Sequence, residues 1–425
     1  MVRTTWWLCG LALLARTAPA QLSDTSSADT LRLTRAQAID SALKRNPQLV
    51  VAREQVVEAR AQRVSQWAIP DPTATASIIQ ERLQPIQRPL VASISIPFPD
   101  KFRLNYQIGT SLVGSAQANY TALQQQIASS TAQTYDSLRV ALRHHSDLTD
   151  SRNLSADFLK KTQARFDAGT APKLDVIRAQ VDLAGTQNAL IANERDITTA
   201  RASLNRLLGR ALGQPVAPAD SLDVPPPLPP LAPVEASALK ARPELAGLQA
   251  ELSGARATTT LAEEFWLPDI IGGIEWDNGA PDVAFPNRYP IYTYGLSMPI
   301  PIFFWQHTGG DIRQSRHHVR ELEASYRDLV ASIDQDVRLS YATAATALQQ
   351  AIYLRDQLLP SARAAYQIAS TSYGLGGSSA LDVLGAQRDL VSAESQYTDA
   401  LAAANQAEAN LERAAAAPLS QFHGQ

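Results

Sequence analysis

The sequence predicts a mainly α-helical protein built from two copies of one repeat, each of which carries a β-hairpin. The first observation is that residues 165–183, RFDAGTAPKLDVIRAQVDL, recur at an offset of 207 as residues 372–390, SYGLGGSSALDVLGAQRDL. The second is that the order of helical and strand patterns around this motif also recurs. A duplicated chain is interpreted repeat by repeat, so each copy is expected to form the same series of elements.

The first 20 residues have the pattern of a secretory signal peptide. Arg3 supplies the positive charge, an apolar run follows, and residues 18–20 (Ala-Pro-Ala) form a cleavage site. The apolar run is too short to cross a bilayer as a helix. The only cysteine, Cys9, lies inside this segment, so the mature chain is expected to have none; lipidation of Cys9 is an alternative.

Composition and motifs exclude several classes of function. A net charge of −3 over 425 residues gives no basic surface for nucleic acid. A chain without cysteine has no disulfides and no thiolate chemistry. The sequence contains no P-loop, dinucleotide fingerprint, HExxH motif or nucleophile elbow, so we expect no enzyme activity and no cofactor. The histidine pairs at 144–145 and 317–318 are adjacent on predicted helices and point apart, so no metal site is expected.

The first repeat is predicted for residues 21–209. Thr34 caps a short amphipathic helix, and Pro47 starts a second helix that ends near Trp67. A period of two then replaces the helical period, which indicates two strands. A helix of about 60 residues follows, roughly 90 Å long at 1.5 Å per residue. The hairpin is expected at about 73–98, and the long helices at about 105–168 and 172–208.

A Pro-rich linker, residues 210–241, precedes the second repeat at 242–417, and 418–425 is a tail. Six residues, PPPLPP, favour an extended polyproline conformation in the linker. The second long helix has a sustained 3-4 apolar spacing, which indicates coiled-coil packing, and Pro360 is expected to kink it. In this repeat the hairpin is expected at about 269–300, and the long helices at about 311–373 and 379–417.

One glycine-containing turn separates the two long helices in each copy. Gly169 suits a left-handed C-cap, and Gly376-Gly377 ends the corresponding helix of the second copy. We expect Thr170 to cap the helix that follows the first turn, and Ser378 or Ser379 to cap the helix after the second.

Four strands from two hairpins leave two unpaired edges, so the chain is expected to oligomerise. In a membrane only a closed barrel satisfies every backbone polar group. The strands alternate small or polar residues with aliphatic and aromatic ones, as a wet lumen and a lipid face require. A soluble antiparallel sheet packed on the helices would show the same alternation and is an alternative. The aromatic residues expected at a membrane interface are Trp276, Tyr289, Tyr292 and Tyr294.

The signal peptide, the Asn-Pro-x-Leu and Arg-Pro-x-Leu helix starts, both hairpins followed by Pro-x-Pro, and the glycine turns before Leu-Asp-Val resemble the TolC family of outer-membrane efflux proteins. The resemblance implies a homotrimer with a 12-stranded transmembrane β-barrel, four strands from each protomer, and an α-helical barrel across the periplasm. It implies an exit duct for a tripartite efflux or type I secretion system, with a periplasmic adaptor and an inner-membrane pump as partners. The alternative is a periplasmic coiled-coil scaffold or adaptor-like protein that does not enter the membrane.

The resemblance also implies roles for residues at the two turns, which become the periplasmic tip. In the family, closure uses an acid that matches Asp175, a tyrosine that matches Tyr373, and a basic residue that matches Ser378. The arginine is absent here, so its charge-assisted bond cannot form, and a firmly latched closed state is not implied. Of two acids at the family's constriction, Asp382 matches one and Gly385 stands at the other.

The two acids at the tip have an alternative explanation. Asp175 and Asp382 also suit ordinary placement at helix N-termini, where an acid is favoured by about 0.3–1 kcal/mol. The turns themselves, Gly169-Thr170 and Gly376-Gly377, are the expected adaptor contacts. The cargo is not identified, and drugs, metal ions, siderophores and proteins all remain candidates.

Overall fold

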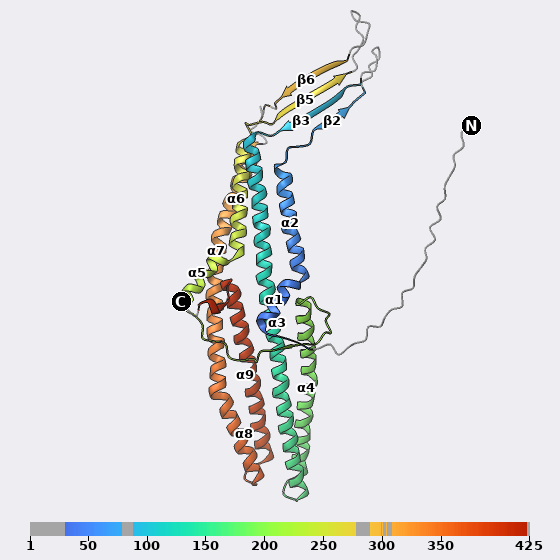
Figure 1. Ribbon diagram of the computed structural model, residues 1–425. Helices are drawn as coiled ribbons and strands as arrows, with labels where there is room; N and C mark the ends of the chain where they lie inside the picture. Colours follow the sequence, from blue (N-terminus) through green and yellow to red (C-terminus); the bar gives the residue numbers. More distant parts are fainter. Residues whose placement is uncertain are drawn as a thin grey trace, which may run out of the picture.

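A computed structural model describes residues 30–78, 88–277, 290–298, 300, 303 and 308–422. The chain is long and narrow, with a four-stranded sheet at one end, two pairs of long helices at the other, and the short helices between them (Figure 1). The prediction of a mainly α-helical chain with two β-hairpins is confirmed. The predicted signal peptide with Cys9, and Tyr289, lie outside the described residues.

The described residues of the first repeat form four helices. Thr34 and Gln37 form a capping box at the start of α1, and Asn46 both ends α1 and caps α2, where Pro47 takes the first position. The third helix starts at Pro99, earlier than predicted, because proline suits the first turn of a helix as well as the end of a strand. Its 69 residues span roughly 100 Å. The helices are α1 (Arg35–Arg45), α2 (Pro47–Trp67), α3 (Pro99–Asp167) and α4 (Lys173–Leu207).

The second repeat has the same order of helices. A turn of π-helix, Leu354–Leu358, ends two residues before Pro360. Proline lacks an N–H and clashes with the carbonyl four residues earlier, and the wider turn accommodates it without ending the helix. The predicted kink site is therefore a π-bulge. The helices are α5 (Leu231–Ala241), α6 (Pro243–Glu263), α7 (Thr308–Tyr353), α8 (Leu359–Gly374) and α9 (Ala380–Ala415).

The predicted linker is more ordered than its proline content indicates. Its last eleven residues form α5, and strand β4 (Val216–Pro218) pairs in parallel with β1 (Leu31–Leu33). Residues of the predicted tail form a short 3-10 helix, in which Leu419 and Phe422 are buried. These segments pack around the middle of the long helices. There, burial of apolar side chains overrides the intrinsic conformational preference of the residues.

The four-stranded sheet joins the two hairpins in one antiparallel array. Its order is β2-β3-β5-β6, so the central β3–β5 pair links the repeats, with Ile94 opposite Gly272. Strands β2 and β6 are the edges. The strands are β2 (Thr73–Ala76), β3 (Leu90–Ile96), β5 (Ile270–Asp277) and β6 (Ile291–Ser297).

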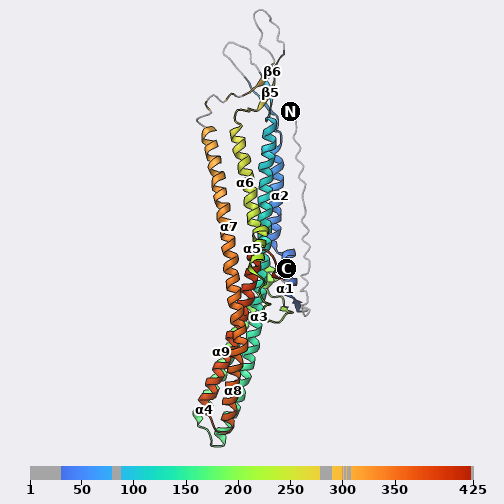
Figure 2. The same cartoon turned by 90° about the vertical axis from the view of Figure 1, so that its left-hand side faces the viewer.

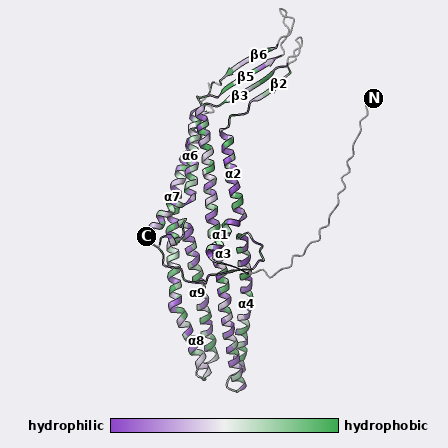
Figure 3. Cartoon of the chain, in the orientation of Figure 1, coloured by the Kyte–Doolittle hydropathy of each residue, from purple (hydrophilic) through white to green (hydrophobic). Residues whose placement is uncertain are grey.

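The register gives this sheet one continuous apolar face. Residues opposite one another in an antiparallel pair share a face, so the apolar positions of neighbouring strands align. The sheet extends beyond the helices, which leave this face uncovered: Tyr294 is 76% exposed and Leu296 is 80% exposed (Figures 1 and 3). The aligned face holds Ala74, Ala76, Leu90, Ala92, Ile94, Ile96, Ile270, Gly272, Ile274, Trp276, Tyr292, Tyr294 and Leu296.

The helices form an open layer with two free edges (Figures 1 and 2). Near the sheet, α2, α3, α6 and α7 lie side by side in that order; near the other end the order is α4, α3, α9 and α8. Close approach of α3 and α6 needs small residues: a Cβ on Gly114 would lie 2.9 Å from the Cβ of Ala250, and one on Gly247 would lie 3.1 Å from that of Ala118. In the part of the chain that the structure describes, no helix is long and apolar enough to cross a bilayer.

Candidate gate at the helical tip

Both tip turns have the same backbone geometry. Gly169 and Gly376 adopt positive φ angles of 74° and 85°. In the first turn the Thr170 amide donates to the Arg165 carbonyl at 2.8 Å, and in the second the Gly377 amide donates to Ser372 at 2.8 Å. These are Schellman motifs, which satisfy the last carbonyls of α3 and α8 and require a residue without a Cβ at the left-handed position. The repeated glycines are therefore explained by the turns.

The caps of the helices that leave the tip differ between the copies. Pro172 precedes α4 and provides no side-chain cap, and the Thr170 hydroxyl donates to the Arg165 carbonyl at 3.0 Å. The prediction that Thr170 caps this helix was wrong, because its hydroxyl donates to a carbonyl at the end of α3 instead. Ser379 caps α9 as expected, in a capping box with Asp382.

An apolar cluster joins the two helical hairpins just behind the turns. It packs residues of α3 and α4 against residues of α8 and α9, and the ring centres of Phe158 and Tyr373 are 5.4 Å apart. Tyr373 is only 2% exposed. The tip of one protomer is thus a single packed unit; the buried members are Phe158, Ala179, Tyr373, Ala380, Val383 and Leu384.

Arg165 lies between the two turns and contacts both. Its guanidinium carbon is 4.4 Å from the centre of the Tyr373 ring, and Nη1 donates to the Tyr373 carbonyl at 2.5 Å. Nη2 donates to the Thr170 carbonyl at 3.5 Å. Nothing in the local sequence marks this residue, and its repeat counterpart is Ser372.

The structure places Asp175 and Tyr373 in the tip but forms no bond between them in this protomer. The Tyr373 hydroxyl is buried and has no hydrogen-bond partner among the residues that the structure describes. Asp175, in the first turn of α4, lies 3.6 Å from Arg178 on its own helix. Asp175 and Tyr373, which were predicted to close the tip together, therefore do not contact each other through a hydrogen bond in this protomer.

The other predicted gate residues lie on the second turn and the start of α9. The Ser378 hydroxyl donates to the Ala369 carbonyl at 3.0 Å, so it stabilises the end of α8. The hydroxyl and the amide of Ser379 both donate to Asp382, which holds the pKa of that exposed carboxyl below its usual value. A Cβ at Gly385 would meet no atom within 4 Å.

A buried polar contact further up the helices connects the repeats. The Gln387 amide donates to Ser155 at 2.7 Å and to Asp182 at 2.9 Å, and the Ser155 hydroxyl donates to Asp182 at 2.7 Å. Ser155 and Gln387 are fully enclosed. Three helices, α3, α4 and α9, meet at this point, and a polar contact of this kind fixes their register because each partner needs the others.

A second polar cluster lies at the middle of the chain, where the short helices meet the long ones. Asp136 accepts from Arg139 at 2.8 Å, and Arg35 lies 3.7 Å from Asp136 and 3.3 Å from Glu412. Burial raises the pKa of the neighbouring Glu408, and the charge of Arg35 opposes that rise. Residues from α1, α3 and α9 are joined here, which anchors the second repeat on the first.

The predicted interface aromatics lie on the uncovered face of the sheet. Trp276 on β5 is opposite Tyr292 on β6, and Tyr294 is opposite Ile274. All three aromatic residues are exposed, from 37% for Trp276 to 76% for Tyr294. They form one aromatic patch on a face that no described helix covers.

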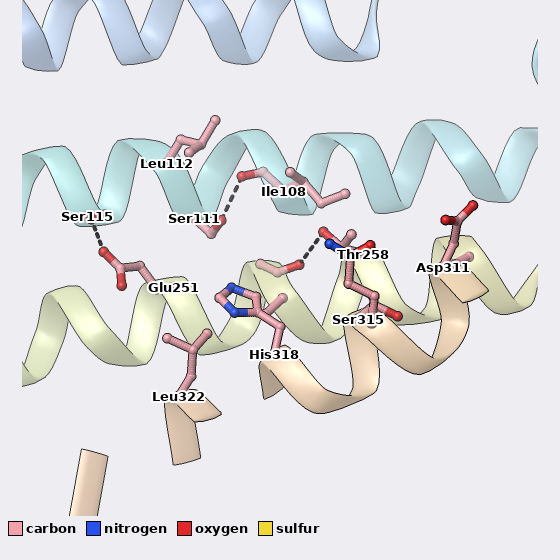
Figure 4. Close-up of a pocket in the computed structure, with 14 residues that line it drawn as sticks. Ile108, Ser111, Leu112, Ser115, Glu251, Thr258, Asp311, Ser315, His318 and Leu322 are labelled. Atoms are coloured by element: carbon pink, nitrogen blue, oxygen red, sulfur yellow. Dashed lines mark hydrogen bonds between the residues drawn. The ribbon is translucent and has the colours of Figure 1, made fainter. Parts of the chain in front are cut away.

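A pocket of about 650 Å³ lies between α3, α6 and α7 (Figure 4). Ser115 donates to Glu251 at 2.9 Å on one wall, and His318 lines another. The nearest carboxylate partner of His318 is Glu321 on its own helix, at 3.4 Å. Across the described ranges, no three His, Cys, Asp or Glu side chains are grouped as metal ligands.

A model of the outer membrane efflux protein family matches residues 38–210 and 235–417, which include both helical hairpins and both pairs of strands. The chain belongs to this family. The resemblance inferred from the sequence is confirmed.

Curated relatives are about a quarter identical to the chain over the stretches that match. The chain is 27% identical over 247 residues to the pyoverdine export outer membrane protein OpmQ of Pseudomonas putida, a match that covers 58% of this chain and 52% of that protein. It is 25% identical over 300 residues to the cobalt-zinc-cadmium resistance protein CzcC of Cupriavidus metallidurans, which covers 70% of this chain and 69% of that one. The chain thus matches only about half the length of OpmQ.

Solved structures match almost the whole chain. The outer-membrane channel OprN superposes with a TM-score of 0.76 at 19% identity and covers 91% of this chain and 90% of its own. The open state of the Neisseria gonorrhoeae MtrE channel superposes with a TM-score of 0.74 at 20% identity, covering 93% and 94%. At these identities the likeness establishes the fold.

Proposed function

We propose that this protein is the outer-membrane channel of a tripartite efflux or type I secretion system, a passive exit duct rather than an enzyme. It receives substrate from an inner-membrane pump through a periplasmic adaptor. The observation that carries the proposal is the open layer: the sheet and the helices of one protomer end on the same two sides in unpartnered edges.

These edges favour a ring of identical chains. One edge consists of β2, α2 and α4, and the other consists of β6, α7 and α8. If each protomer joins its first edge to the second edge of its neighbour, the contact is head-to-tail, and repeated rotation closes the protomers into a ring. Three protomers with four strands each give a 12-stranded barrel, which leaves no strand edge unpaired. The helices then form a barrel that continues the same duct across the periplasm.

Exposed apolar residues on the edge helices support this contact. On α4 they recur with helical spacing on the side away from α3, and on α8 they continue to the second tip turn, where Leu375 is 86% exposed. Burial against a neighbouring protomer removes this surface from water. The residues are Leu174, Ile177, Val181 and Ile191 on α4, and Tyr353, Ile368 and Leu375 on the opposite edge.

The uncovered sheet face supports insertion into lipid. A periplasmic scaffold, the alternative, would have to leave Tyr294 and Leu296 in water together with the rest of the apolar face. Contiguous apolar surface of this kind is rare on soluble monomers. We assign Trp276, Tyr292 and Tyr294 to the membrane side, near the lipid interface, where aromatic residues are favoured.

We place the resting constriction at the tip. Asp382 is exposed there at the start of α9, and three copies of it would form a ring that attracts cations. Asp175, Tyr373, Ser378 and Gly385 belong to the same gate.

The exposed turns Gly169-Thr170 and Gly376-Gly377 are the surfaces offered to the adaptor. The pump and adaptor select the cargo, since relatives in one family are named for pyoverdine export and for cobalt, zinc and cadmium resistance.

Conductance measurements in planar bilayers, combined with the mass of the detergent-solubilised complex, test this function. We expect a trimer that sediments with outer membranes, needs detergent for extraction and forms ion-conducting pores. A monomeric, water-soluble and non-conducting product would contradict the proposal and favour the scaffold.

A further inference from the structure

One side chain connects the two tip turns of a protomer, and it is neither Asp175 nor the residue at 378. We propose that Arg165 is a clasp that holds the second tip turn against the first and sets how far the tip opens. The inference rests on the proposed function in that it concerns the gate of the same channel. It departs from the arrangement implied by the family resemblance, because the arginine comes from the first repeat and its target is a ring and a carbonyl.

Arg165 lies at a position where a cation is favoured. The guanidinium lies at the C-terminal ends of both α3 and α8, where the carbonyls of Thr170 and Tyr373 accept its N–H groups. The C-terminal ends of helices carry partial negative charge, so one cation stabilises both. Helix α3 supplies the side chain and α8 supplies its main acceptor, so separation of the two hairpins must break the contact.

The contact depends on the shape of arginine. Its flat guanidinium stacks at 4.4 Å over the Tyr373 ring while an N–H reaches the carbonyl of the same residue. A lysine ammonium can meet the ring or the carbonyl but cannot present a planar fork to both. The Tyr373 ring is itself fixed by Phe158 behind it. The clasp therefore uses the ring and backbone of Tyr373 and leaves its hydroxyl unused.

The clasp contains no carboxylate. In the described part of the chain Arg165 forms no ion pair, since Asp167 accepts from Gln163 and Asp175 lies beside Arg178. The contact is made by a cation, an aromatic ring and backbone carbonyls, which sets it apart from a latch built on Asp175.

The experiment measures tip opening in two ways on the full-length channel. The first is resting conductance in planar bilayers for the wild type and for Arg165→Gln, Arg165→Lys and Tyr373→Phe. The second is the distance between spin labels at Ala168→Cys and Leu375→Cys, one on each turn. The only natural cysteine, Cys9, lies in the predicted signal peptide, so no other label site is expected after processing. Co-expression with excess unlabelled chain restricts the distance to one protomer.

We expect Arg165→Gln to increase the open population on the order of tenfold, because it removes a charged hydrogen bond and a cation–π contact together. The label distance should lengthen or broaden in parallel. Arg165→Lys should lie between the wild type and Arg165→Gln. Tyr373→Phe should open the tip less than Arg165→Gln, since phenylalanine keeps the ring and the backbone carbonyl that Arg165 contacts. The Arg165 variants should still assemble, because the apolar cluster is unchanged.

Two results would overturn the clasp: Arg165→Gln that matches the wild type in both measurements, or Tyr373→Phe that opens the tip as far as Arg165→Gln. The label distance does not need a conducting pore. If the wild type forms no channel, the proposed function fails, while the distance in Arg165→Gln still decides whether Arg165 holds the turns together.

Discussion

The guanidinium of Arg165 lies 4.4 Å from the centre of the Tyr373 ring, and these two residues belong to different copies of the repeat. The duplication would place equivalent residues at equivalent points, but the counterpart of Arg165 is Ser372. The two tip turns are therefore alike in backbone and unlike in side-chain chemistry. An asymmetric tip allows one hairpin to hold the other.

Replacement of Tyr373 with phenylalanine tests the use of its hydroxyl. The hydroxyl is buried without a partner, so Tyr373→Phe should leave resting conductance unchanged and raise the free energy of unfolding by about 1 kcal/mol. Thermal unfolding in detergent and bilayer conductance measure the two effects. A rise in resting conductance would instead indicate that the hydroxyl bonds Asp175 in the closed trimer.

Asp382 should make the channel sensitive to divalent cations. If its carboxylates line the pore, Asp382→Asn should raise the concentration of divalent cation needed for half-block, and unchanged block would refute the assignment. Hydrogen bonds from Ser379 lower the pKa of Asp382. A lowered pKa keeps the group ionised below the usual aspartate range, so block, and any stability from this contact, should be lost only as pH falls through the lowered value. Ser379→Ala should move the loss of block to higher pH.

The residue at 385 offers a gain of function. Gly385→Asp would give each protomer a second carboxylate near Asp382, and a Cβ at this position meets no atom within 4 Å. We expect a several-fold lower half-blocking concentration of divalent cation, because attraction grows with the charge of the ring. Gly385→Asn is the matched control, with nearly the same volume and no charge. Equal block in both variants would place residue 385 away from the pore.

The ends of the two returning helices provide a matched test of backbone strain. Gly209 and Ala416 occupy equivalent positions, both with positive φ, 65° and 54°. The left-handed conformation costs a residue with a Cβ roughly 1–2 kcal/mol, so Ala416→Gly should stabilise the protein by about 0.5–1 kcal/mol. Gly209→Ala should destabilise it by at least as much, since the new Cβ would lie 2.8 Å from the Arg45 carbonyl. Thermal unfolding measures both, and the same sign for both would contradict the strain argument.

The sequence predicted most helices and strands because their signals are local. The caps at Thr34 and Asn46, the prolines at helix starts and the glycines of the tip turns act within a few residues. Helix α3 starts at Pro99, earlier than predicted. This shows the limit of local signals, because proline suits both the end of a strand and the first turn of a helix. Helix α5 and the β1–β4 pair were missed because burial against the long helices, rather than propensity, stabilises them.

The residues of the site also fall into two groups: those that the sequence marks and those that only the fold brings together. Asp175 and Asp382 lie in the repeated motif, and the family resemblance marked both of them and Ser378. The structure shows each of the three bonded to its own helix or to the adjoining helix end. Arg165 and the Gln387–Ser155–Asp182 contact could not be found. Their partners lie up to 232 residues apart in the chain, and nothing in the local sequence indicates which helix faces will meet.

By itself the sequence determined the duplication, the order of elements, the glycine turns and the alternation that gives each strand an apolar side. Only the tertiary structure decided that β3 pairs with β5, so that four apolar sides become one uncovered face, and that Arg165 reaches Tyr373. The physical reason is the distance along the chain over which each interaction acts. Backbone conformation and capping depend on neighbouring residues, whereas pairing of strands and contact between helix ends depend on which distant surfaces bury one another.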